Sequence, residues 1–317
     1  MMDKIRYFIL SLLLLSCQRS PQYRSQSLND PMDGTLSQRG NALLTQKVES
    51  MGQPKKRMVV FDFWNHTPVQ EASIGSFAAS ELKRGLNLSQ KVIIPADLRS
   101  RLGTEDFVEG EDVKVAQLIR EGRRMGVAVL IIGRIGKIVF RQKADEVGLL
   151  RKKQSLAAAD LEVKIFDVQA GREMMALSQS GEANKSALVA FESKLIDPVT
   201  YRSELVRSAV REAIAGLIPD VIRSIEKMTW QGRIAKLSGL KAYVNAGRVS
   251  GLMAGDILKV LTLGEDIYDP ASGAYLGRAQ GQLKGTLEVL DYIGADGALT
   301  QVHTGGNFRE GDLVQLY

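Results

Sequence analysis

Side chains that commonly carry out catalysis are sparse in this sequence of 317 residues. It has two histidines, His66 in an expected turn and His303 on an expected strand, and neither has a cysteine or histidine at metal-ligand spacing. Ser224 and Lys227 match the S-x-x-K spacing of some acyl-transfer enzymes, but the other motifs of those enzymes are absent. Phosphate-binding glycine loops, nucleophile elbows and zinc-protease motifs do not occur either. The sequence therefore predicts no catalytic, cofactor or metal site, and favours a protein that is not an enzyme.

Cys17 is the single cysteine and the residue with the clearest chemical role. Lys4 and Arg6 precede an apolar run over 7–15. A helix of about nine residues rises about 14 Å, under half of a ~30 Å bilayer core, so the run is typical of a signal peptide over 1–16. The residues LLSC that end it resemble the lipobox of bacterial lipoproteins, in which the cysteine is lipidated. The alternative is a secreted protein that is cleaved elsewhere and has a chance cysteine.

The resemblance to a lipobox also implies a location. Several acyl chains on Cys17, at about 0.8 kcal/mol per buried CH₂, would give a stable anchor. Gln18 rather than aspartate follows the cysteine, which by resemblance favours the outer membrane, with the protein facing the periplasm. The net charge of +6 suits an anionic partner or simply a soluble basic protein. Export argues against nucleic acid as that partner.

Composition changes twice along the expected mature chain. Residues 17–56 are rich in serine, glutamine, asparagine and proline, which predicts a flexible tether. Residues 57–229 combine apolar strand patterns with helical patterns, which predicts one α+β domain around a mixed sheet. Residues 230–317 place glycine turns between short alternating strands, which predicts a small all-β barrel or sandwich.

The elements expected in the α+β domain follow from apolar spacing and turn residues. Helices are expected over 73–86, 96–103, 111–126 and 202–228. Strands are expected over 57–67, 90–95 and 127–140, and a hairpin over 155–181. The hairpin should turn at Gln169, Ala170 and Gly171, and Pro219 should kink or interrupt the last helix.

The stretches VVFDFWNHTP, VIIPADLRSRL and AQLIREGRRMGVAVLIIGRI follow the order of elements in the CsgG-like family. The resemblance covers residues 57–227 and extends to the TolB N-terminal domain and to LpoB. The tail, with YVNAGRVSGLMAGDILKV and GEDIYDPASGAYLG, resembles the C-terminal domain of FlgT. Together these resemblances imply a ring or scaffold component of an envelope-spanning machine. A flagellar basal-body ring and a curli-type export apparatus are the two settings, with other copies of the chain and other envelope proteins as partners.

Two alternatives accompany this prediction. The tether favours an LpoB-like activator of a peptidoglycan synthase, and the CsgG-like family also includes true outer-membrane secretion channels. In such a channel, residues 136–163 and 179–203 would be the membrane hairpins. They carry many lysines and arginines, each costing about 2–4 kcal/mol on a lipid face, so we expect solvated loops or contacts between subunits instead. The candidate contact residues are Arg151, Lys152, Lys153, Leu188, Val189 and Phe191.

Overall fold

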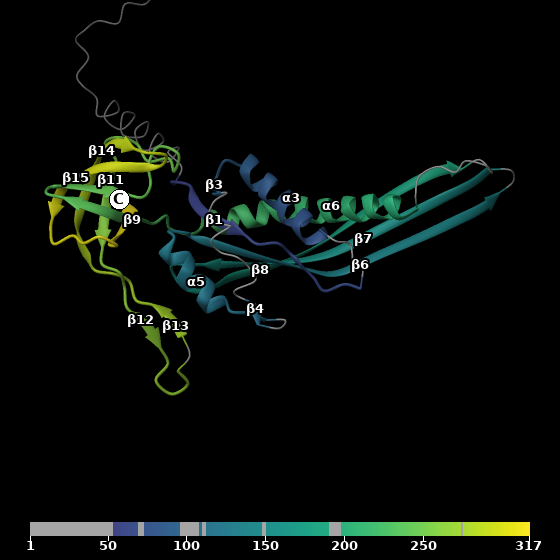
Figure 1. The fold of residues 1–317 in the computed structure, drawn as a ribbon, viewed down its shortest axis with the longest axis horizontal. Helices are drawn as coiled ribbons and strands as arrows, with labels where there is room; N and C mark the ends of the chain where they lie inside the picture. Colours follow the sequence, from purple (N-terminus) through teal and green to yellow (C-terminus); the bar gives the residue numbers. More distant parts are fainter. Residues whose placement is uncertain are drawn as a thin grey trace, which may run out of the picture. The chain divides into compact units, whose positions relative to one another are not determined.

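The computed structural model describes residues 53–68, 73–95, 108–109, 112–147, 150–189, 198–273 and 275–317. Residues Gln53–Tyr317 form one compact unit (Figure 1). The predicted signal peptide, Cys17, nearly all of the predicted tether and the helix expected over 96–103 lie outside the described residues. Within the described part, every helix is too short or too polar to cross a membrane.

The first half of this unit is built on a mixed sheet. Its strand order is β3-β1-β6-β7-β8, and β2 pairs with β6 at the side. β1 runs parallel to β3 and β6, whereas β7 runs antiparallel to both β6 and β8. This confirms the predicted mixed sheet of the α+β class. The strands are β1 (Lys56–Val60), β2 (Trp64–Asn65), β3 (Val92–Ile93), β6 (Val129–Val147), β7 (Leu150–Asp167) and β8 (Arg172–Val189).

Apolar residues on both faces of β1 and β6 explain why helices cover both faces of this part of the sheet. Met58 and Ile131 face one core, and Val59 and Leu130 face another, because successive side chains of a strand alternate between faces. Helices α3 (Ile74–Leu88) and α6 (Pro198–Glu226) cover the first face, and α5 (Val115–Arg124) covers the second (Figure 1). The predicted helices over 73–86 and 111–126 are confirmed, with shifted ends.

Helix α6 is continuous over 29 residues and passes through Pro219. Of the two expectations for Pro219, the interruption is therefore wrong, and the kink stays a prediction. Pro219 and Ala215, the residue four positions earlier, both lie on the exposed side of the helix. The carbonyl group that loses its hydrogen bond there can be hydrated, while Leu217 and Val221 stay buried in the core and hold the helix in place.

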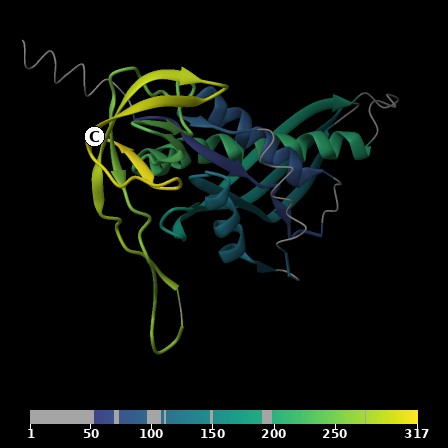
Figure 2. The same ribbon diagram turned by 60° about the vertical axis from the view of Figure 1, so that its left-hand side comes forward.

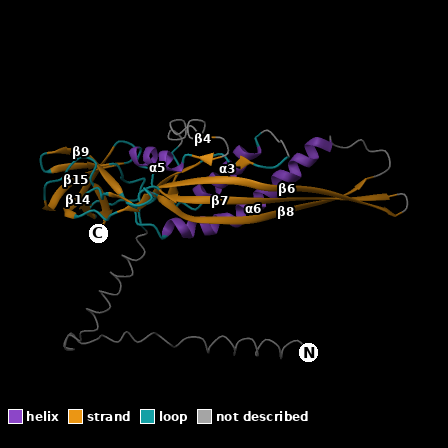
Figure 3. Cartoon of the chain, turned by 90° about the horizontal axis from the view of Figure 1, so that it is seen from below, coloured by secondary structure: helices purple, strands orange, loops and turns teal. Residues whose placement is uncertain are grey.

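Strands β6, β7 and β8 are 19, 18 and 18 residues long, and they lie side by side in Figure 3. The expectation of solvated loops over 136–163 and 179–203 is wrong for the described residues. A buried row on β7, which alternates with more exposed residues, lies on the face that α6 covers. The row consists of Ser155, Ala157, Ala159 and Leu161. The turn between β7 and β8, at residues 168–171, confirms the predicted turn.

The second half of the unit contains a closed barrel of six strands, as the glycine-rich pattern predicted. Its order is β10-β15-β14-β11-β16-β9, and its core includes Trp230, Leu258 and Leu287. A two-stranded ribbon, β12 (Asp266–Tyr268) with β13 (Tyr275–Arg278), leaves the barrel between β11 and β14 (Figure 2). The barrel strands are β9 (Gly232–Ser238), β10 (Lys241–Val244), β11 (Ile257–Leu261), β14 (Leu283–Ile293), β15 (Gly297–Gly305) and β16 (Leu313–Leu316).

Candidate functional site

The two predicted contact segments meet in one sheet. Lys152 of β7 lies opposite Leu188 of β8, and Arg151 lies opposite Val189. Lys153 lies one position further along the same strand pair, opposite Ala187. Sequence spacing gave no sign of this pairing, because more than thirty residues separate the two segments. Phe191 and Cys17 lie outside the described residues.

The other neighbour of β7 supplies acidic residues to the same place. Glu146 of β6 lies opposite Arg151, and Asp145 lies opposite Lys152. The basic stretch therefore has acidic cross-strand neighbours within the chain, and its role in contacts between subunits stays a prediction.

The three long strands leave two open edges within the described part of the chain. Strand β8 is the last in the sheet order and has β7 as its neighbour on one side alone. Strands β1 and β2 pair with β6 only as far as Ile135. From Lys137 to Val147, β6 is therefore paired with β7 alone among the described residues. Open strand edges carry unpaired N–H and C=O groups, which are a template for pairing with another strand.

The faces of the three strands differ in chemistry. Ala157 and Ala159 lie under α6, on the buried face. On the opposite face Arg134 pairs with Glu162, and the Ser180 hydroxyl donates a hydrogen bond of 2.7 Å to Asp160. One face of the three strands is thus covered by helix α6, and the other face carries polar side chains. In the described part of these three strands, the open edges still offer backbone hydrogen bonds.

The residues with conventional catalytic chemistry do not form a site in the described part of the chain. His66 is exposed, and His303 lies 3.2 Å from the Thr286 hydroxyl. The Ser224 hydroxyl is buried and donates to the carbonyl of Asp220 in its own helix, at 2.8 Å. Among the described residues, no three acidic, histidine or cysteine side chains lie close enough together to hold a metal ion.

A cluster of charged groups joins the sheet to the barrel, and sequence reasoning missed it. Arg123 of α5 donates to the carbonyl of Val168 at 2.7 Å and to the hydroxyl of Tyr275 at 3.1 Å. Its Nη1 also lies 3.5 Å from Asp266. Tyr275 is 152 residues from Arg123 in the sequence, so no local pattern could have revealed this contact.

Asp266 is the anionic centre of this cluster. Arg278 holds it with two parallel hydrogen bonds, of 3.0 Å from Nε and 3.1 Å from Nη2. The hydrogen bond from Arg278 is the main reason why the pKa of Asp266 lies below its ordinary value of 3.8, and the charges of Arg278 and Arg123 act in the same direction. The carboxylate therefore stays ionised and keeps the β12–β13 ribbon against α5.

A second ion pair joins β1 to the turn between β14 and β15. Arg57 lies 3.0 Å from Asp296, whose carboxylate also accepts hydrogen bonds from the backbone N–H groups of Gly247 and Ser250 and from the Ser250 hydroxyl. Burial alone would raise the pKa of Asp296. The hydrogen bonds, first of all those from Ser250, outweigh burial and hold the pKa below 3.8.

No protein-family model and no curated protein matches this sequence. Solved structures do show similarity. The hypothetical protein CT253 from Chlamydia trachomatis is 12% identical, with 54% of this chain and 98% of that one covered and a TM-score of 0.34. The lipoprotein GNA1162 from Neisseria meningitidis is 11% identical, with coverages of 55% and 99% and a TM-score of 0.29.

The C-terminal domain of LpoB from Salmonella enterica is similar as well. It is 13% identical, with 44% of this chain and 92% of that one covered and a TM-score of 0.28. TM-scores this low carry no argument about function. The resemblances to CsgG and FlgT stay predictions.

Proposed function

We propose that the chain is a lipid-anchored scaffold protein of the bacterial outer envelope, and that copies of it assemble into a ring. The observation that carries the proposal is the pair of open edges in the described part of the chain, one on β6 from Lys137 to Val147 and one on β8. The work is done by binding and not by catalysis.

The geometry of the two edges explains why a ring would form. The edge of β6 on one copy differs from the edge of β8 on the next copy, so the contact is heterologous and repeats around a rotation axis until it closes. β6 and β8 both run antiparallel to β7 and therefore parallel to each other. The new strand pair between copies would be parallel, and its hydrogen bonds would come from groups that one copy leaves open.

The anchor and the tether complete the proposal. Cys17 would carry the lipid, and residues 17–56 would let the sheet and barrel work at a distance from the outer membrane, on its periplasmic side. A flagellar basal-body ring or a curli-type export apparatus is the machine that the sequence resemblances favour. If the chain does not assemble, an LpoB-like activator of a peptidoglycan synthase becomes the better proposal.

A proline scan of the β8 edge tests the ring. Successive N–H groups of a strand point alternately to its two neighbours, so of Ser178 and Gln179 one faces β7 and the other faces the open edge. We expect one of the variants Ser178→Pro and Gln179→Pro to keep its melting temperature and to lose assembly. The other should lose stability, because it removes a hydrogen bond to β7.

Each proline variant serves as the control for the other, since both add the same residue to the same strand. Native mass spectrometry of the full chain in detergent measures assembly, and circular dichroism measures the melting temperature. If Ser178→Pro and Gln179→Pro both assemble as the unmodified chain does, the β8 edge is not the contact between copies.

The lipid anchor has its own test. In Cys17→Ala, labelling with an azide-bearing palmitate analogue in growing cells should disappear, because the thioether needs the cysteine sulfur. The signal run should also remain uncleaved, which gel mobility reports. A Ser16→Ala variant keeps the cysteine and should still be labelled. Label on Cys17→Ala would contradict the anchor.

A further inference from the structure

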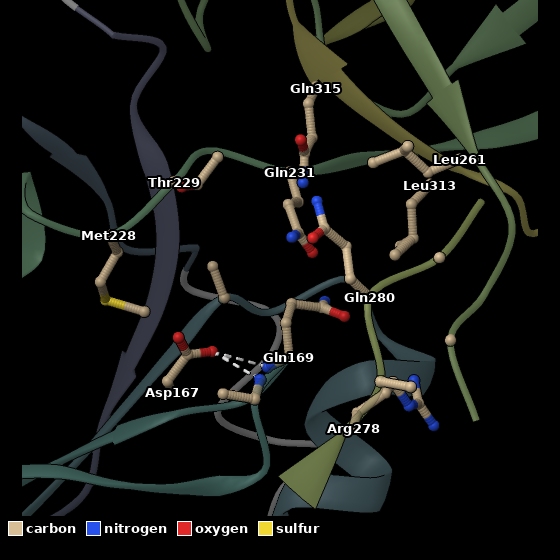
Figure 4. A pocket seen from close by; sticks show the side chains of 15 residues that line it. Asp167, Gln169, Met228, Thr229, Gln231, Leu261, Arg278, Gln280, Leu313 and Gln315 are labelled. Atoms are coloured by element: carbon tan, nitrogen blue, oxygen red, sulfur yellow. Dashed lines mark hydrogen bonds between the residues drawn. The ribbon is translucent and has the colours of Figure 1, made fainter. Parts of the chain in front are cut away.

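A pocket of about 250 Å³ lies where the turn after β7 meets the barrel (Figure 4). Its lining includes three glutamines from three different segments. Gln169 comes from the turn, Gln231 comes from the link between α6 and β9, and Gln280 comes from the segment after β13. In Figure 4 these three amide side chains point toward one another from different walls.

The outer face of the barrel forms one wall, and strand register explains which residues line it. Arg233 of β9 lies opposite Leu313 of β16, which in turn lies opposite Leu261 of β11. Gln231 lies directly before β9 and also lines this wall. The two leucines therefore make one part of this wall apolar, and Gln231 makes the neighbouring part polar.

Three polar atoms on residues that line the pocket are buried and have no hydrogen-bond partner among the described residues. They are the acceptors Gln169 Oε1 and Gln231 Oε1 and the donor Arg278 Nη1. Buried groups without partners cost about 1–3 kcal/mol each, and folded proteins contain few of them. Their concentration beside one pocket indicates that something polar binds there.

The charges of the junction favour an anion. Arg123, Arg233 and Arg278 lie close enough to interact, whereas Asp266 pairs with two of them. Burial, together with the positive charges of Arg278 and Arg123, lowers the pKa of Arg233. Asp167 also lines the pocket, but its Oδ1 accepts the backbone N–H groups of Gln169 and Ala170 at 2.9 Å. Arg278 and Asp167 are the charged residues of the pocket lining, and because the Asp167 carboxylate accepts these backbone groups, the open Nη1 donor of Arg278 remains available to an anion.

The unpartnered acceptors narrow the chemistry further. Phosphate and sulfate would satisfy Arg278, but they bring no N–H group to the two glutamine oxygens. A peptide end brings both, since its terminal carboxylate accepts from guanidinium groups and its last amide donates to a side-chain oxygen. The volume is below the ~300–1,000 Å³ of sites for drug-sized molecules and suits one or two residues.

We propose that this pocket binds the carboxyl-terminal end of a peptide, with the carboxylate at Arg278 and the last amide N–H groups at Gln169 and Gln231. The leucine row of the barrel then contacts the terminal side chain. This site does not depend on ring assembly, because no residue of the open edges takes part in it.

The test uses N-acetyl-alanyl-alanine as the probe and the full chain in detergent, with saturation-transfer NMR and titration to obtain Kd. We expect saturable binding in the millimolar range, as befits so small a ligand. The C-terminal amide of the same probe should bind at least about tenfold more weakly, because it lacks the negative charge. The L,L and D,D forms are measured separately, since L residues end proteins and D residues end cell-wall peptides.

Substitutions of pocket residues test whether the probe binds in the pocket. Gln231→Glu and Gln280→Glu each add a carboxylate to a different wall and should weaken binding at least about tenfold. Gln301→Glu adds the same charge on an exposed position of β15 and should leave Kd unchanged. Melting curves show which variants fold. The proposal is wrong if neither probe form saturates, if the amide binds equally well, or if both folded pocket variants bind as the unmodified chain does.

Discussion

Replacing Gly181 by valine should lower the free energy of unfolding by about 3 kcal/mol, the upper end of the usual cost of overpacking. Gly181 lies on β8 directly under α6. A Cβ atom there would overlap the carbonyl oxygen of Ala209 and the backbone nitrogen of Ala213. Both are backbone atoms of the helix, so the contact cannot be relieved by turning a side chain. The helix or the strand must move, and the core between them opens.

Gly136→Val is the matched control for this prediction. Gly136 is also a strand glycine of the same sheet, but a Cβ atom there would meet only the carbonyl oxygen of Asp160, at 3.9 Å. We expect a change within about 0.5 kcal/mol. Urea unfolding of the full chain, followed by circular dichroism, measures both variants. Equal stability of the two would mean that α6 does not pack closely on β8.

The second large effect is expected for Asp296→Ala, which should cost about 3 kcal/mol. The change leaves the buried N–H groups of Gly247 and Ser250 without an acceptor and Arg57 without its ion-pair partner. Unpaired buried donors and a lost charge-assisted hydrogen bond each cost about 1–3 kcal/mol, and some hydration offsets the sum. Asp291→Ala, at an exposed position of β14, is the control and should change little.

The loss of stability at low pH gives an independent test of the role of the Asp296 carboxylate. Hydrogen bonds hold the pKa of Asp296 below 3.8 in the folded chain, so the unfolded chain takes up its proton first as the pH falls. Its stabilisation is complete above about pH 5 and is lost as the pH drops through 3.8 toward the folded-state pKa. Asp296→Ala should therefore lose less stability between pH 5 and pH 3 than the unmodified chain. Equal acid losses would contradict the role assigned to Asp296.

Local patterns predicted the elements whose residues face one core with a regular period. The apolar spacing of Ile74, Ala78 and Leu82 was sufficient for α3, and Gly171 marked the turn between β7 and β8. The length of β6 was not predicted, because its outer half carries charges such as Arg141. Its pairing with β7 is visible only once the two strands are set in register.

The contacts between the sheet and the barrel could not be predicted for a related reason. Arg57 and Asp296 are 239 residues apart, and each is an ordinary charged residue in its own stretch of sequence. The glutamines of the pocket have no motif either. What makes Gln169 and Gln231 notable is that their side-chain oxygens are buried without partners, and burial depends on the complete fold.

The central claim, that copies assemble through the edges of β6 and β8, is tested most directly by the mass of the full chain. Native mass spectrometry in detergent at about ten micromolar should give one dominant species whose mass corresponds to three or more subunits. Electron microscopy should show closed rings. A species of one subunit at every concentration, both in detergent and on liposomes, would contradict the ring and leave the β8 edge without its proposed role.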